Sequence, residues 1–186
     1  MKYKEIQKVA EGRFINRYNV IYDMGEGKDL GYEMVARDKE IPDYKAEVCT
    51  AFAQGNLGRA IMLCNSEHFN EIREEAIHLL KYIHEMELHE VIDAVSRATK
   101  FKLEITDYLD VIMIWYRDIL LYKATKDIDK VVFKDEINYI KEQAVKSSYE
   151  GIELILESLE KAKTRLKANV NFELAMELLF LTIKEN

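Results

Sequence analysis

The fold is decided by residues 106–125, which read TDYLDVIMIWYRDILLYKAT. The centre of this stretch, Val111–Tyr116, is apolar on every side of a helix, whereas a helix at a protein surface keeps one polar face. Such a helix has to be covered on all sides by other elements. The stretch therefore predicts the buried middle helix of a bundle, with Thr106 as the expected cap at its start.

Apolar residues recur at helical spacing on both sides of this stretch. Upstream, Asp43 is an expected helix start and Gly55 an expected stop. Downstream, Ser147 or Ser148 is expected to cap a long helix, because serine at that position is more often a cap than a nucleophile. Asn169 is the expected cap of the last helix. The spacing predicts helices over 46–52, 57–64, 69–83, 88–95, 134–146, 152–166 and 174–186.

Residues 1–41 differ in composition from the rest of the chain. Four of the seven glycines lie before Pro42, which is the single proline. Aromatic and β-branched residues alternate with polar ones over 14–23 and again over 30–37, on either side of a glycine-containing turn. We therefore expect a mainly α protein, in which a small N-terminal antiparallel β-hairpin or meander precedes a helical bundle.

Composition limits the class of protein. Hydrophobic residues make up 48% of the chain, enough for a packed core, and the net charge of -7 disfavours a free-standing nucleic-acid binder. Cys49 and Cys64 do not form a CxxC motif, so they predict small core residues in a reducing cytoplasm and neither a zinc site nor a redox pair. No apolar run has the length that a membrane span needs, about 20 residues.

The histidines and carboxylates do not suggest a metal or cofactor site. His84 and His89 are five residues apart, whereas an HExxH zinc motif needs histidines four apart on one helix face. Glu75 and His78 form a single E-x-x-H, and a di-iron bundle needs two. The basic run over 161–167 suits the C-terminal end of a helix better than it suits a phosphate site. We expect no bound metal and no cofactor.

Three stretches of the helical part resemble one protein family. They are QGNLGRA at 54–60, Asp110 together with WYRDILLYK at 115–123, and NVNFELAMELL at 169–179. In order and spacing they are similar to the C-terminal portion of delta-prime subunits of the bacterial DNA polymerase III clamp loader, over about 44–186. The resemblance implies a remnant of the helical lid of an AAA+ module at 42–65 and a helical collar for oligomerisation at 66–186, after the β-rich segment at 1–41 that the composition predicts.

The resemblance also implies a function. Such a chain would be a non-catalytic accessory protein of DNA replication, assembling with other clamp-loader subunits and meeting DNA only indirectly. In ATP-hydrolysing relatives a lid arginine senses the phosphates, but that position falls on Gly58, and Arg59 points elsewhere because one residue turns a helix by about 100°. No Walker A string is present either. The expected interface or structural residues are Gly55, Gly58, Arg59, Asp110, Trp115, Arg117, Asp118, Asn169, Asn171 and Glu177. Arg117 and Asp118 interrupt an apolar helix, so we expect both at an exposed or interfacial edge.

A second resemblance leaves an alternative open. Residues 11–18 and 32–38 are similar to the N-terminal strands of Nudix ADP-sugar pyrophosphatases, which would make the chain a fragment of a nucleoside-diphosphate-sugar hydrolase. That enzyme needs clustered carboxylates for magnesium, and the nearest string, EIREE at 71–75, looks like the solvated face of a helix. A helical interaction domain unrelated to replication is a third interpretation. The open edges of a hairpin could also pair with a second copy and give a homodimer.

Overall fold

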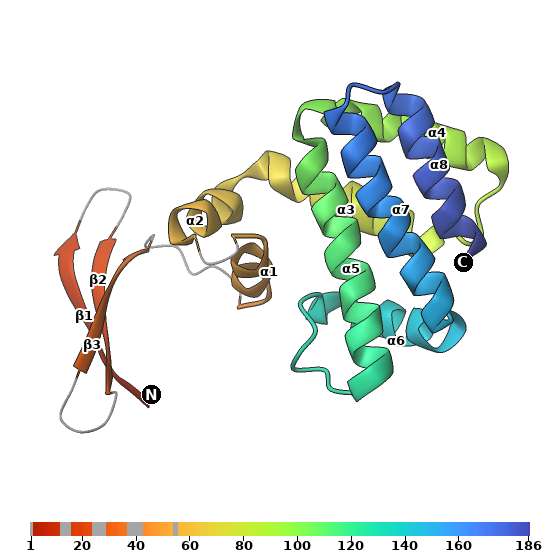
Figure 1. The fold of residues 1–186 in the computed structure, drawn as a ribbon. Helices are drawn as coiled ribbons and strands as arrows, with labels where there is room; N and C mark the ends of the chain where they lie inside the picture. The colour runs from red at the N-terminus through yellow and green to blue at the C-terminus, as the bar shows by residue number, and fades with distance from the viewer. Residues whose placement is uncertain (1, 12–15, 24–28, 37–42, 54–55) are drawn as a thin grey trace. The chain divides into compact units, whose positions relative to one another are not determined.

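A computed structural model describes residues 2–11, 16–23, 29–36, 43–53 and 56–186 (Figure 1). The chain divides into two compact units, 1–65 and 66–186, and each is described by itself. Among the described residues, no helix combines the length and the apolar character that crossing a bilayer requires.

The described residues of the first unit form three strands and two helices. The strands β1 (Lys2–Glu11), β2 (Asn16–Asp23) and β3 (Asp29–Ala36) form an antiparallel sheet in the order β1-β2-β3. The β2–β3 register is regular, whereas β1–β2 carries two register shifts. The helices α1 (Asp43–Ala53) and α2 (Leu57–Asn65) pack against each other. Cys49 and Cys64 are buried on these helices, which confirms the prediction that they are core residues.

The second unit is helical throughout, and the chain as described is mainly α, as the sequence predicts. The helix α5 packs against α3, α6 and α7, and α8 packs against α7 and α4 (Figure 1). The elements of this unit are α3 (Glu67–Tyr82), α4 (Leu88–Ala98), the 3-10 helix η1 (Thr99–Glu104), α5 (Ile105–Thr125), the 3-10 helix η2 (Lys134–Glu136), α6 (Ile137–Lys146), α7 (Tyr149–Lys167) and α8 (Phe172–Glu185).

The packing of α5 against α3, α6 and α7 confirms the central helix that the apolar run predicts, although Met113 and Ile114 of that run are partly exposed. Tyr108, Ile112, Trp115 and Tyr116 have no exposed surface. The expected cap at Thr106 is wrong, because α5 begins one residue earlier and continues directly from η1. A chain that enters a helix from a 3-10 turn already uses its first backbone N–H groups, so a side-chain cap is not required there.

Serine or asparagine side chains cap the starts of α3, α7 and α8. Ser66 Oγ accepts from Phe69 N at 3.1 Å, and Ser148 Oγ accepts from Gly151 N at 2.9 Å, so a serine cap on α7 is confirmed. The cap of α8 is Asn171, whose Oδ1 accepts from Leu174 N at 3.0 Å. The prediction of Asn169 as this cap is therefore wrong.

Asn169 has another structural role. Its φ of 55° is in the left-handed region, which asparagine adopts more readily than most residues. It lies between the end of α7 and the start of α8, where the chain reverses. The sequence indicated an asparagine at this helix boundary, but the spacing did not show that Asn169 belongs to the turn and that Asn171 is the cap.

One buried polar side chain connects three helices of the bundle. Gln143 of α6 accepts a hydrogen bond from Trp115 Nε1 of α5 at 2.8 Å. Its own Nε2 donates to the Leu80 carbonyl of α3 at 2.7 Å. Both ends of the amide are therefore satisfied inside the core, as a buried amide requires. The link fixes the position of α6 against α3 and α5.

We predict that Gln143→Leu lowers the free energy of unfolding by about 2 kcal/mol, because it leaves the Trp115 N–H buried without an acceptor. Urea denaturation followed by circular dichroism measures the loss. The control is the same substitution in a Trp115→Phe background, where it should cost about 1 kcal/mol less. Equal costs in both backgrounds would show that the hydrogen bond does not stabilise the fold.

Candidate functional site: the α5 motif and the α8 face

The residues expected at the site do not form one cluster. Asp110, Trp115, Arg117 and Asp118 lie along α5, and a second group lies at the start of α8 and within it. A third group is on α2 in the first unit, except for Gly55, which lies outside the described residues. Each group is described separately below, because each makes different contacts.

The carboxylate of Asp118 is buried, which contradicts the expectation of an exposed or interfacial edge. Its side chain has no exposed surface, although Arg117 beside it is 51% exposed. One oxygen of Asp118 accepts from Val132 N at 2.8 Å and from Phe133 N at 2.9 Å, and the other accepts from Arg117 at 3.0 Å. The partners that permit this burial lie 14 and 15 residues further along the chain, so spacing within α5 could not reveal them.

Burial raises the pKa of Asp118 above its ordinary value. The backbone N–H groups of Phe133 and Val132 and the guanidinium of Arg117 oppose this shift but do not cancel it. The charged carboxylate is therefore costly in the folded state, and its hydrogen bonds offset part of that cost. The Asp118 carboxylate therefore fixes the position of the segment that contains Val132 and Phe133.

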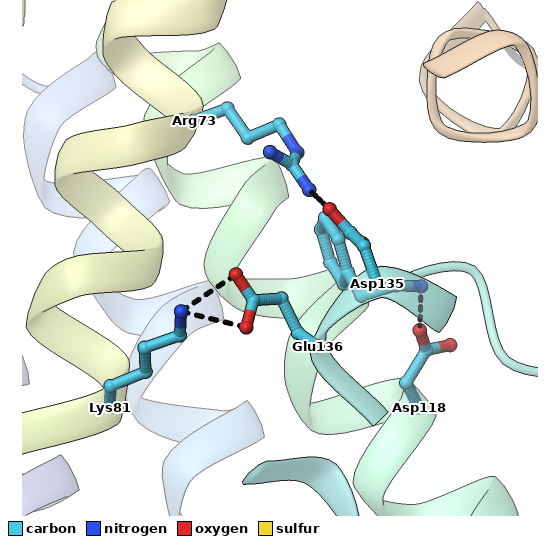
Figure 2. Close-up of polar contacts among 6 residues, drawn as sticks. Arg73, Lys81, Asp118, Asp135 and Glu136 are labelled. Atoms are coloured by element: carbon cyan, nitrogen blue, oxygen red, sulfur yellow. Dashed lines mark hydrogen bonds and ion pairs between the residues drawn. The ribbon is translucent and has the colours of Figure 1, made fainter. Parts of the chain in front are cut away.

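The segment that Asp118 holds is also fixed to α3. We call residues 131–136 the α5–α6 connection. Its Phe133 is buried against Trp115, with 5.8 Å between ring centroids, and the Arg73 guanidinium lies 5.7 Å from the Phe133 ring centroid. Arg73 also forms an ion pair with Asp135 (Figure 2).

A second ion pair follows one residue later in the connection. Lys81 of α3 lies 2.7 Å from the carboxylate of Glu136, and both side chains are mostly buried (Figure 2). Ion pairs shielded from water in this way are screened less by salt than surface pairs are. Together with Asp118 and Phe133, they fix the connection from α5 on one side and from α3 on the other.

Asp110 also makes an internal contact. Its carboxylate lies 3.0 Å from the Lys163 ammonium of α7, and each side chain is about one-fifth exposed. Trp115 is occupied by the Gln143 hydrogen bond. Of the four predicted α5 residues, Arg117 is the most exposed, and the other three stabilise contacts between helices.

The α8 group offers an exposed surface. Asn171 is occupied as the cap of the helix, and Glu177 is partly exposed. On either side of Glu177, the apolar side chains Leu174 and Leu178 are 51% and 41% exposed. Residues four apart lie on one helix face, so these leucines and Glu177 form a stripe on α8. We call it the α8 outer stripe.

The α2 group belongs to the first turn of that helix. Arg59 N donates to Asn56 Oδ1 at 3.0 Å, so Asn56 satisfies one of the free N–H groups at the helix start. A Cβ added at Gly58 would approach Asn56 Oδ1 at 3.4 Å, which is an ordinary contact. Space alone therefore does not require glycine at position 58.

The strings that suggested catalytic chemistry have structural partners. In EIREE, Arg73 pairs with Asp135, and Glu75 accepts from Arg97 of α4 at 2.6 Å. His84 lies in the turn after α3, whereas His89 is in α4, so the two histidines do not share a helix face. Among the residues that the structure describes, no three His, Cys, Asp or Glu side chains are placed to share a metal ion.

We predict that Asp118→Ala lowers the free energy of unfolding by about 3 kcal/mol, because two backbone N–H groups lose their acceptor. Asp118→Asn keeps an acceptor oxygen without the buried charge and should cost about 1 kcal/mol. Urea denaturation measures both. Equal losses for the two variants would contradict the account.

The same pair of proteins tests the pKa shift. Because folding raises the pKa of Asp118, the unfolded chain releases this proton at a lower pH than the folded chain does. The wild type therefore loses stability relative to Asp118→Asn as the pH rises from the ordinary carboxylate range toward neutrality. If the wild type instead gained stability over Asp118→Asn as the pH rises, the pKa of Asp118 would be lowered by folding, which contradicts the assigned shift.

Comparison with known proteins identifies the family. The family model described as "DNA polymerase III, delta subunit, C terminal" matches residues 71–185. Over 133 residues the chain is 29% identical to "DNA polymerase III subunit delta'" of Bacillus subtilis (strain 168), a match that covers 70% of this chain and 40% of that protein. No solved structure matches the chain. The chain belongs to the family of C-terminal domains of DNA polymerase III delta subunits, and its helical part is a delta-prime-like C-terminal region.

Proposed function

We propose that this chain is a delta-prime-like accessory subunit of DNA polymerase III, which acts by assembling with other subunits of a clamp loader. The observation that supports this most strongly is the extent of the family match. It runs from within α3 to the end of α8, and so covers nearly all of the helical unit. In this proposal the bundle is a collar that neighbouring subunits pack against.

The proposal gives the chain no catalytic role of its own. The sequence holds no Walker A string to bind nucleotide phosphates. Its net charge of -7 favours contact with DNA through neighbouring subunits over direct binding. The setting of this function is the cytoplasm, where bacterial replication takes place.

We assign the proposed roles to segments in the order in which they occur along the chain. Residues 66–186 form the collar, and residues 42–65 correspond to the end of an AAA+ lid. Residues 1–41 are a separate β-rich segment without an assigned role in assembly. Of the expected site residues, Asp110, Trp115, Asp118 and Asn171 support the collar fold, and Glu177 belongs to the surface that meets a neighbour.

The α8 outer stripe is the surface that we propose for this contact. Leu174 and Leu178 lie one helical turn apart and are half exposed, and Glu177 supplies a charge between them. Apolar anchors spaced four residues apart are the usual means by which one helix docks on another protein. The Nudix alternative has no comparable support, since neither the family model nor the curated relative is a Nudix protein.

We predict that the full chain co-purifies with the clamp-loader subunits of its own organism when they are co-expressed, and that Leu174→Glu/Leu178→Glu abolishes this association. The matched control is Leu154→Glu on α7, a leucine that is 50% exposed and should tolerate the change without losing association. Native mass spectrometry gives the composition of the complex.

Two outcomes would contradict the proposal. If the wild-type chain binds none of the subunits, it is a helical domain without a role in the clamp loader. If the α8 variant and the α7 control bind equally well, the contact lies on another face of the bundle. Circular dichroism of each variant separates lost binding from lost folding.

A further inference from the structure

A second face of the bundle carries a large groove. Its volume is about 890 Å³, and it runs along α7 beside the C-terminal half of α5. The apolar part of its lining comes from Leu120, Ile152, Leu156 and Tyr149. Tyr149 is half exposed, so apolar surface is open to a partner here. Figure 1 shows α5 and α7 side by side along this face.

The charged side chains that line the groove are ordered by sign along α7. Glu153, Glu157 and Glu160 come first, and Lys161 and Arg165 follow. All of them except Arg165 are exposed, and Arg165 is partly so. The groove therefore has an acidic half toward the start of α7 and a basic half toward its end.

This order makes the face complementary to itself. If two copies meet with their α7 helices antiparallel, the acidic half of each lies against the basic half of the other, and the two helix dipoles are opposed as well. A parallel arrangement would bring like charges together. A twofold interface requires one patch that complements itself under rotation, and the charge order on α7 meets that requirement.

We infer that a second copy of this chain docks on the α7 face, giving an antiparallel dimer in which Glu153 and Glu157 of each copy face the partner's Lys161 and Arg165. The apolar lining, which lies in the acidic half and includes Leu156, is covered by the partner's basic half in the dimer. This goes beyond assembly with other subunits, which the proposed function places on the α8 outer stripe.

Contacts within one copy do not prevent the pairing. Lys161 lies 3.0 Å from Glu157 of its own chain, and both side chains are more than half exposed. An exposed pair of this kind contributes at most about 1 kcal/mol, so both groups can re-pair across an interface at little cost.

Sedimentation equilibrium of the full chain tests the inference, with charge reversal of either half of α7. The wild type should dimerise, and Glu153→Lys/Glu157→Lys should weaken dimerisation at least about tenfold, which corresponds to the loss of about 1.4 kcal/mol. Lys161→Glu/Arg165→Glu should weaken it similarly. An equimolar mixture of the two variants should restore a dimer, because an α7 face with four basic side chains at 153, 157, 161 and 165 then meets one with four acidic side chains there. Added salt should weaken that heterodimer.

The control places the same charge change elsewhere on the bundle. Glu74→Lys/Asp93→Lys alters two exposed carboxylates on α3 and α4 and should leave dimerisation unchanged. A monomeric wild type at every concentration would overturn the inference. So would a dimer that is insensitive to both reversals, or a mixture that stays monomeric. Co-purification with clamp-loader subunits is a separate measurement, so failure of the dimer and failure of the proposed function are distinguishable.

Discussion

A carboxylate buried without partners would destabilise this bundle, and the arrangement around Asp118 meets that constraint. The connection between α5 and α6 turns two of its backbone N–H groups toward Asp118. This places Phe133 against Trp115 and brings Asp135 and Glu136 within reach of α3. With the start of α6 fixed in this way, Gln143 can join Trp115 to the Leu80 carbonyl. One buried charge thus orders the contacts of three helices.

Periodicity predicted the helices of the second unit well, because helical spacing is a local property of the sequence. It also predicted the burial of α5 from a single apolar run. It failed where a side chain's hydrogen-bond partners lie far along the chain, and where two asparagines two residues apart both suited a helix start. Asp118 was placed at an edge because its partners lie beyond the end of α5, and Asn169 was mistaken for the cap that Asn171 provides. The role of Gln143 was not predicted. It lies on the buried face of α6 together with Ile140 and Ala144, and a polar residue on a buried face indicates an internal hydrogen bond.

The resemblance identified the family, whereas the roles that it implies for single residues stay predictions. Asp110, Trp115 and Asp118 were chosen as structural or interface positions, and their contacts lie within the bundle. Two apolar residues on the outer helix faces were not among the expected site residues. Leu174 on α8 lies within the third motif, and Leu156 on α7 lies outside all three. The motif residues Asp110, Trp115 and Asp118 therefore maintain the scaffold, and the surfaces that we propose for binding lie on the outer faces of α7 and α8.

Amide hydrogen exchange at Val132 and Phe133 tests most directly whether Asp118 organises the bundle. If the buried carboxylate holds these two N–H groups, both amides should exchange as slowly as the core amides of α5, because they open only when the whole bundle opens. Exchange of either amide at the rate of an exposed loop would show that the connection opens independently, and would contradict the role assigned to Asp118.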